Sequence, residues 1–242
     1  MHACIPFTIK GHVAVITMSN APANTWTHDS LDSLADLILD FNQDKNIYSL
    51  VITGAGEKFF SAGADLNLFA DGDKQTAVLM ATAFGRAFEA LSQFRGLSIA
   101  AINGYAMGGG LEVALACDLR IAESQAQMAL PEAAVGLLPC AGGTQNLAWL
   151  VGEGWAKRMI LCGERVSAQQ ALDIGLVEAV VESGQALEQA LLWAQKSEQQ
   201  SPTSVAACKR LIQNARSHPM IAGMACERDE FVNLFNSNDQ KE

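Results

Sequence analysis

Apolar and polar positions alternate in short blocks along the first half of the chain. Two apolar runs in residues 5–18 flank a Lys-Gly pair, which predicts two short strands joined by a tight turn. Residues 31–41 repeat leucine, isoleucine and phenylalanine at helical spacing, behind a threonine that can cap the helix. Predominantly apolar runs at 48–54 and 97–104 are typical of buried strands, and a second helical pattern covers 74–94.

The pattern changes towards the C-terminus. Residues 54–69 predict a long loop, 109–117 a short helix and 118–123 a further strand. Alternating strands and helices imply parallel pairing with right-handed crossovers, and so an α/β core. Helical patterns dominate afterwards, with one strand near 177–181. They cover residues 142–151, 153–162, 167–174, 185–200, 202–215 and 220–235.

Composition and charge narrow the class of protein. The 242 residues are 50% hydrophobic and 17% charged, which is the composition of a globular chain long enough for one large domain. The formal net charge of -10 argues against a nucleic-acid surface, which needs clustered lysine and arginine. An anionic small molecule is still possible, because a few backbone N–H groups can hold it.

The cysteines and the chain's apolar segments indicate a reducing, cytoplasmic setting. The cysteines form no C-x-x-C pair and no metal-like spacing, and we expect most of them to be reduced core residues. The N-terminus shows no signal-peptide pattern. The longest apolar region, near 97–117, is broken by Asn103, the glycines and Glu112, so we expect no membrane span. The cysteines are Cys4, Cys117, Cys140, Cys162, Cys208 and Cys226.

Three consecutive glycines, Gly108 to Gly110, stand directly before Leu111 and Glu112. A glycine-rich turn that opens a helix leaves backbone N–H groups uncovered, and this geometry suits a developing negative charge. Glu112 would lie in the first turn of that helix. Taken alone, a plain turn followed by a glutamate that favours the helix dipole is the better explanation.

Two further stretches favour a catalytic site. SAGADL offers a second small-residue turn with N–H groups around Ala64. Glu132 follows Pro131 and precedes a run of alanine, valine and leucine, where apolar surroundings would raise the pKa of its carboxyl group. Two N–H turns with two carboxylates predict an oxyanion hole served by an acid and a base.

Four segments together resemble the crotonase, or enoyl-CoA hydratase/isomerase, family. They are FFSAGADL (59–66), INGYAMGGGLEVALACD (102–118), LPEAAVGLLPCAGGTQ (130–145) and GERVSAQQALDIGLVEAVV (163–181). The resemblance implies an α/β spiral of stacked β-β-α turns with a mostly helical C-terminal region that trimerises, often as a dimer of trimers. On this basis we expect a core with the active site over 1–195 and a helical region over 196–242.

The resemblance also implies a reaction. The substrate would be a 2-enoyl-CoA thioester, with no separate cofactor and no metal, hydrated to 3-hydroxyacyl-CoA in fatty-acid or related metabolism. The N–H groups of Ala64 and Gly109 would hold the thioester oxygen. Glu112 would activate water, and Glu132 would protonate the α carbon or act through the same water. The implied substrate-binding residues are Pro22, Ala23, Asn24, Ala62, Asp65, Leu66, Gly108 and Gly136.

Some features leave alternatives open. The chain ends at NSNDQKE, before the last helix usual in the family, so either this helix is lost or the natural chain continues. The same scaffold also supports double-bond isomerisation with Glu132 alone, other acyl-CoA reactions, or CoA binding without catalysis. A nucleotide-dependent oxidoreductase is disfavoured, because VITGAGEKF lacks the third glycine of a dinucleotide turn. No pattern in the sequence gives the acyl chain length.

Overall fold

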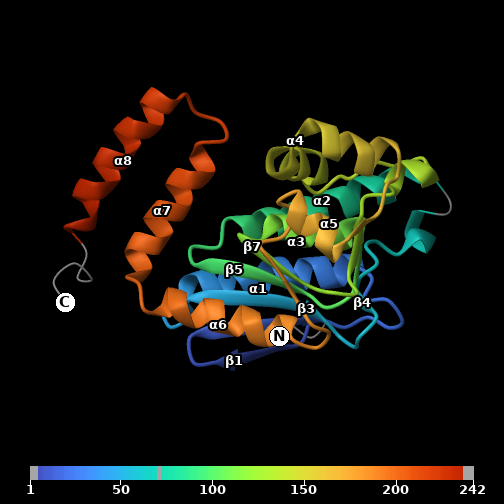
Figure 1. Ribbon diagram of the computed structural model, residues 1–242, viewed down its shortest axis with the longest axis horizontal. Coiled ribbons are helices and arrows are strands. Elements are labelled where there is room, and N and C mark those ends of the chain that lie inside the picture. Colours follow the sequence, from blue (N-terminus) through green and yellow to red (C-terminus); the bar gives the residue numbers. More distant parts are fainter. Residues whose placement is uncertain (1–4, 70–71, 237–242) are drawn as a thin grey trace.

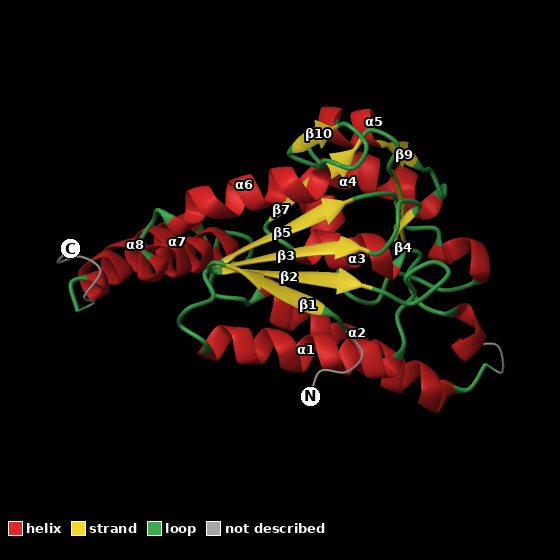
Figure 2. Cartoon of the chain, turned by 90° about the horizontal axis from the view of Figure 1, so that it is seen from below, coloured by secondary structure: helices red, strands yellow, loops and turns green. Residues whose placement is uncertain are grey.

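A six-stranded sheet forms the centre of the protein (Figure 2). The computed structural model describes residues 5–69 and 72–236. The first two strands pair antiparallel, as the Lys-Gly turn predicts, and all the remaining neighbouring pairs of this sheet are parallel. In spatial order the strands are β1 (Phe7–Lys10), β2 (Val13–Met18), β3 (Ser49–Gly54), β5 (Leu97–Ile102), β7 (Leu119–Glu123) and β10 (Ala179–Val181).

A smaller four-stranded sheet stands beside the large one and carries the loops of the site. Its strands are β4 (Phe59–Ser61), β6 (Tyr105–Met107), β8 (Gln127–Ala129) and β9 (Val166–Ser167). Along the chain, β3 leads into β4, β5 into β6 and β7 into β8. Three successive turns of a spiral therefore each contribute one strand to the large sheet and one to the small sheet. This is the spiral that the resemblance implied. The prediction of a continuous loop over 54–69 is wrong, because β4 and a short 3-10 helix, η1 (Leu66–Phe69), interrupt it.

Helices cover both faces of the large sheet. They are α1 (His28–Gln43), α2 (Lys74–Ser92), α3 (Gly109–Ala116), α4 (Gly143–Leu161), α5 (Ala168–Asp173) and α6 (Ala186–Glu198). Alternate strand residues point to opposite faces. Ala14 and Ile16 therefore join the core under α1 and α2, whereas Val13 and Val15 pack with α6. Thr27 caps α1 as predicted, and Gly152 interrupts α4 between the two predicted helical segments.

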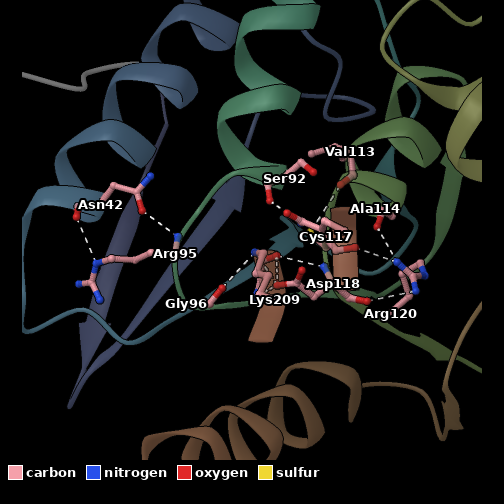
Figure 3. A network of polar contacts seen from close by, with 12 residues as sticks. Asn42, Ser92, Arg95, Gly96, Val113, Ala114, Cys117, Asp118, Arg120 and Lys209 are labelled. Carbon is pink, nitrogen blue, oxygen red and sulfur yellow. Dashed lines mark hydrogen bonds and ion pairs between the residues drawn. The ribbon is translucent and has the colours of Figure 1, made fainter. Parts of the chain in front are cut away.

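The last two helices, α7 (Pro202–Asn214) and α8 (Met220–Leu234), form an arm that projects from the α/β body (Figure 1). Lys209 on α7 attaches the arm to the body, because its Nζ donates to Asp118 Oδ2 at 2.8 Å and to the Gly96 carbonyl at 3.1 Å (Figure 3). Ala207 is the one buried residue of α7, and α8 has none within its described length. The boundary near residue 195 between the core and the helical C-terminal region stays a prediction.

The prediction that most cysteines are core residues is wrong. Cys117 is buried, whereas the other described cysteines, all free, are exposed in a loop, at the end of α4 and on the arm: Cys140, Cys162, Cys208 and Cys226. The apolar spacing of a helix does not reveal whether a neighbour covers its face, so the sequence overestimated their burial. Cys4 lies outside the described residues. Among the described helices, none is both long enough and apolar enough to cross a membrane.

Candidate active site

Each position of the glycine triplet requires glycine, the first because of its backbone conformation and the other two because of close packing. Gly108 precedes α3 with a φ of 54°, which side-chain-bearing residues rarely adopt. A Cβ on Gly109 would lie 2.9 Å from the Phe84 ring, and one on Gly110 would lie 2.1 Å from the Ser61 carbonyl oxygen. The triplet therefore lets the start of α3 pack directly against β4 and α2.

The two N–H turns predicted from the sequence lie side by side. A Cβ built on Gly63 would lie 2.9 Å from the Gly109 nitrogen, so Ala64 is next to the start of α3. The neighbouring loop is fixed by Trp26, whose N–H donates to the Gly63 carbonyl at 2.8 Å and whose carbonyl accepts from Asp65 N–H. Within the described chain, the N–H groups of Ala64 and Gly109 donate no hydrogen bond. They are available to an anionic oxygen.

Glu112 is held in one orientation from the first turn of α3. The residue is 3% exposed, and its Oε1 accepts hydrogen bonds from Ala141 N–H at 2.8 Å and Gly143 N–H at 2.9 Å. Burial raises the pKa of Glu112, and these two hydrogen bonds partly oppose that effect. Both bonds from the described residues go to Oε1, and Oε2 accepts none from them.

Glu132 begins a short 3-10 helix, η2 (Glu132–Val135). Its carboxylate lies beside Gly108, where a built Cβ would be 3.1 Å from Oε1. Both carboxylate oxygens are buried, and neither has a hydrogen-bond partner among the described residues. Burial, with a smaller contribution from the charge of Glu112, raises the pKa of Glu132 to about 7. This carboxyl group can therefore give or take a proton near neutral pH.

A cavity of about 250 Å³ brings both glutamates and both N–H turns together. Of the residues predicted from the sequence, seven line it: Ala62, Ala64, Leu66, Gly108, Gly109, Glu112 and Glu132. Apolar side chains complete the wall, with Phe84, Met107, Leu137 and Leu138 among them.

The other predicted binding residues do not line this cavity. Asn24 is buried and its Nδ2 donates to the carbonyls of Ala55 and Phe59, which gives it a role in holding the loop. Asp65 accepts from the backbone and side chain of Asn67 and so stabilises a turn. Pro22 and Ala23 lie in the loop between β2 and α1, where the Ala23 carbonyl accepts from Ala62 N–H, and Gly136 ends η2 with a φ of 75°.

Cys140 is a site residue that the sequence reasoning missed. It lines the cavity next to Ala141, whose N–H holds Glu112. Desolvation of the thiol and the nearby carboxylates of Glu112 and Glu132 raise the pKa of Cys140 to about 11, so the thiol is neutral at physiological pH. Its position inside LPCAGGTQ, the stretch that carries Glu132, was the signal available in the sequence.

Paired N–H turns and two glutamates around one cavity can stabilise a developing negative charge and move protons, and comparison with known proteins gives the family. The family model described as enoyl-CoA hydratase/isomerase matches residues 8–242. The chain belongs to this enzyme family, also called the crotonase superfamily.

Individual relatives agree with this assignment. The chain is 37% identical to the short-chain-enoyl-CoA hydratase of Clostridium acetobutylicum over 238 residues, covering 96% of this chain and 90% of the relative. It is 41% identical to the 2,3-dehydroadipyl-CoA hydratase of Escherichia coli over 199 residues, covering 82% and 77% respectively. A structure of DspI from Pseudomonas aeruginosa superimposes with a TM-score of 0.97 at 64% identity, covering 99% of this chain and 91% of that one.

Proposed function

We propose that the protein hydrates a 2-enoyl-CoA thioester to the corresponding 3-hydroxyacyl-CoA, with Glu112 and Glu132 handling one water molecule. The observation that carries this proposal is the buried, unpartnered carboxylate of Glu132 in the same cavity as Glu112. A carboxyl group left without partners in the protein needs a ligand to bind, and water between two carboxyl groups supplies one. Names of relatives that contain the word hydratase support the same reaction.

In this mechanism the thioester carbonyl oxygen accepts hydrogen bonds from the N–H groups of Ala64 and Gly109. Glu112 takes a proton from water as the water oxygen bonds to the β carbon, and the π electrons move to the thioester oxygen as an enolate. The two N–H groups stabilise that charge, which is worth roughly a hundred- to a thousandfold in rate for each donor. Glu132 then delivers its proton to the α carbon, and proton exchange between the two glutamates restores the site.

The proposal is tested by the ultraviolet absorbance of crotonyl-CoA, which falls when the conjugated double bond is hydrated. Glu112→Gln and Glu132→Gln should each lower the rate about a hundredfold or more, because each removes a proton-transferring group. Glu153→Gln, on the exposed face of α4, is the matched control and should be unaffected.

The same assay separates the alternatives. A Glu112→Gln variant that retains activity in shifting a 3-enoyl double bond would identify an isomerase that uses Glu132 alone. If the wild-type protein binds CoA thioesters but converts none of the enoyl-CoAs, the hydratase proposal is refuted in favour of a binding protein.

We further propose that the active form is a homotrimer or a dimer of trimers built through the arm. The support is the number of large apolar side chains that α7, α8 and the following residue leave exposed, since such a surface favours association. They are Ile212, Met220, Ile221, Met224, Phe231, Val232 and Phe235. Light scattering should give a mass three or six times that of the 25.8 kDa chain, and Ile221→Asp with Phe231→Asp should lower it.

A further inference from the structure

The helix that carries Gly109 and Glu112 is not fixed by a cap at its N-terminus. No side chain caps the start of α3, and the Gly109 N–H donates no hydrogen bond within the described residues. This end of the helix must stay open, because the thioester oxygen approaches the Gly109 N–H there. A helix as short as α3 also owes most of its stability to tertiary contacts. We therefore looked for the contacts that fix α3 from its other end.

Arg120 holds the C-terminal end of α3. It lies in β7 and is 2% exposed. Its Nη1 donates to the carbonyl of Cys117, which directly follows the helix, at 2.9 Å and to that of Ala114 in the last turn at 3.5 Å (Figure 3). Carbonyls at a helix end lack partners within the helix, and a cation there also complements the helix dipole. Since α3 has no basic residue in its own last turn, Arg120 supplies both the donors and the charge.

The remaining donors of the guanidinium fix Arg120 itself. Nε donates to the Leu176 carbonyl at 2.8 Å, and Nη2 donates to the Asp118 carbonyl at 3.3 Å and to Glu178 Oε1. Together with the two bonds to the end of α3, these use as many N–H donors as a guanidinium has. Glu178 also accepts from the Arg120 backbone N–H through Oε2. The end of α3 is thus joined by a buried, fully bonded cation to β7 and to the segment before β10.

We propose that Arg120 is a positioning residue for the reaction: by fixing the C-terminal end of α3, it determines where the Gly109 N–H and the Glu112 carboxylate lie at the other end. The helix is about 12 Å long and rigid, so a shift at one end is carried to the other. A displacement of about 1 Å at reacting groups can cost about a hundredfold in rate.

This inference rests on the proposed function in taking the Gly109 N–H and Glu112 as the groups that act on the thioester and on water. It adds a residue outside the cavity on which both groups depend, since Arg120 does not contribute to the cavity lining.

The test measures the polarisation of a bound thioester separately from turnover. The probe is 4-(dimethylamino)cinnamoyl-CoA, whose absorbance moves to longer wavelength when N–H groups bind its carbonyl oxygen and draw electrons towards it. Arg120→Lys keeps the positive charge but has three donors in place of five. We expect about half of the wild-type wavelength shift and about a tenfold lower kcat with crotonyl-CoA, with KM within about twofold of wild type.

Lys209→Met is the matched control. It removes a cation from the same junction of α3 and β7, but Lys209 binds the Asp118 side chain and the Gly96 carbonyl and no carbonyl of the helix. It should lower the melting temperature, yet leave the wavelength shift unchanged and kcat within about twofold of wild type. An Arg120→Lys variant that loses thermal stability but keeps the wild-type kcat and wavelength shift would show a purely structural arginine and overturn the inference.

Glu178→Gln keeps the inference testable if Arg120→Lys does not fold. It leaves the guanidinium in place and removes only the charge of its partner. We therefore expect a smaller effect in the same direction, about threefold in kcat, with a partial loss of the wavelength shift. Wild-type values of both quantities in Glu178→Gln would then overturn the inference.

The probe also separates this inference from the proposed function. If the wild-type protein hydrates no enoyl-CoA, but the wavelength shift of the probe is present and falls in Arg120→Lys, the proposed function is wrong and the positioning role stands. If the wild-type protein binds the probe without any wavelength shift, the positioning role is refuted whatever the reaction is.

Discussion

Replacing Glu132 by glutamine should stabilise the folded protein above neutral pH while it removes activity. In the unfolded chain this carboxyl group has its ordinary pKa of 4.5, whereas burial in the cavity raises the pKa to about 7. Between these values the unfolded chain binds fewer protons than the folded chain, so the free energy of unfolding decreases as the pH rises. Well above pH 7 the buried carboxylate is ionised and lowers the free energy of unfolding by the full amount that the difference between the two pKa values sets.

The magnitude follows from the difference between the two pKa values. At about 1.4 kcal/mol for each pH unit, the interval from 4.5 to about 7 corresponds to about 3.5 kcal/mol. Because the Glu132 residue is only partly buried as a whole, we take about half of this, near 1.7 kcal/mol. For a chain of this size that stabilisation raises the melting temperature by about 3–7 °C.

The assay is thermal unfolding followed by circular dichroism at pH 8 and pH 5. Glu132→Gln should unfold at a higher temperature than wild type at pH 8, and about a quarter of the difference in free energy should remain at pH 5, where the wild-type carboxyl group is largely protonated when folded. Glu153→Gln, which removes an exposed partner of Lys157, should give no stabilisation at either pH. A Glu132→Gln variant no more stable than wild type at pH 8 would refute the reasoning from buried charge.

Three further changes test other parts of the structure. Gly143→Ala places a Cβ 2.8 Å from Glu112 Oε1 and should lower kcat about a hundredfold in the crotonyl-CoA assay; full activity would show that the base tolerates displacement. Lys209→Met leaves Asp118 without its ion-pair partner and should lower the melting temperature by several degrees, whereas Lys209→Arg keeps the charge and should lower it less; equal melting temperatures for Lys209→Met and wild type would refute this role. N-ethylmaleimide should abolish activity by alkylating Cys140. The rate of inactivation should be low at pH 7 and rise about tenfold per pH unit up to about pH 11, because the thiolate is the reactive form. If a Cys140→Ala variant is inactivated equally fast, alkylation of this thiol is not the cause.

The large elements of the fold could be predicted because their residues carry periodic signals. The strands at Ser49–Gly54 and Leu97–Ile102 are predominantly apolar runs, and α1 and α2 repeat apolar residues on one face. The small sheet could not be predicted. Its strands have two or three residues each, and they exist because distant segments pair, as Phe59 does with Tyr105.

The candidate site shows the same division. Glu112 and Glu132 could be selected from the sequence because a carboxyl group in an apolar run needs an explanation. The donors that orient Glu112 could not be selected, because a backbone N–H such as that of Ala141 carries no side-chain signal. The exposure of Leu137 depends on which segments cover it, and only the assembled fold decides that.

The small sheet also determines when the site can come into existence during folding. Its pairings join Phe59 to Tyr105, Ala106 to Met128 and Gln127 to Ser167, so each connects segments far apart in sequence. Contacts of this kind require closure of long loops and form late relative to local helices. Helical signal should therefore return before activity when the denatured chain refolds. The two loops with the free N–H groups and the two glutamates come from different turns of the spiral. A chain that has folded only part of the spiral therefore lacks some of the groups that line the cavity.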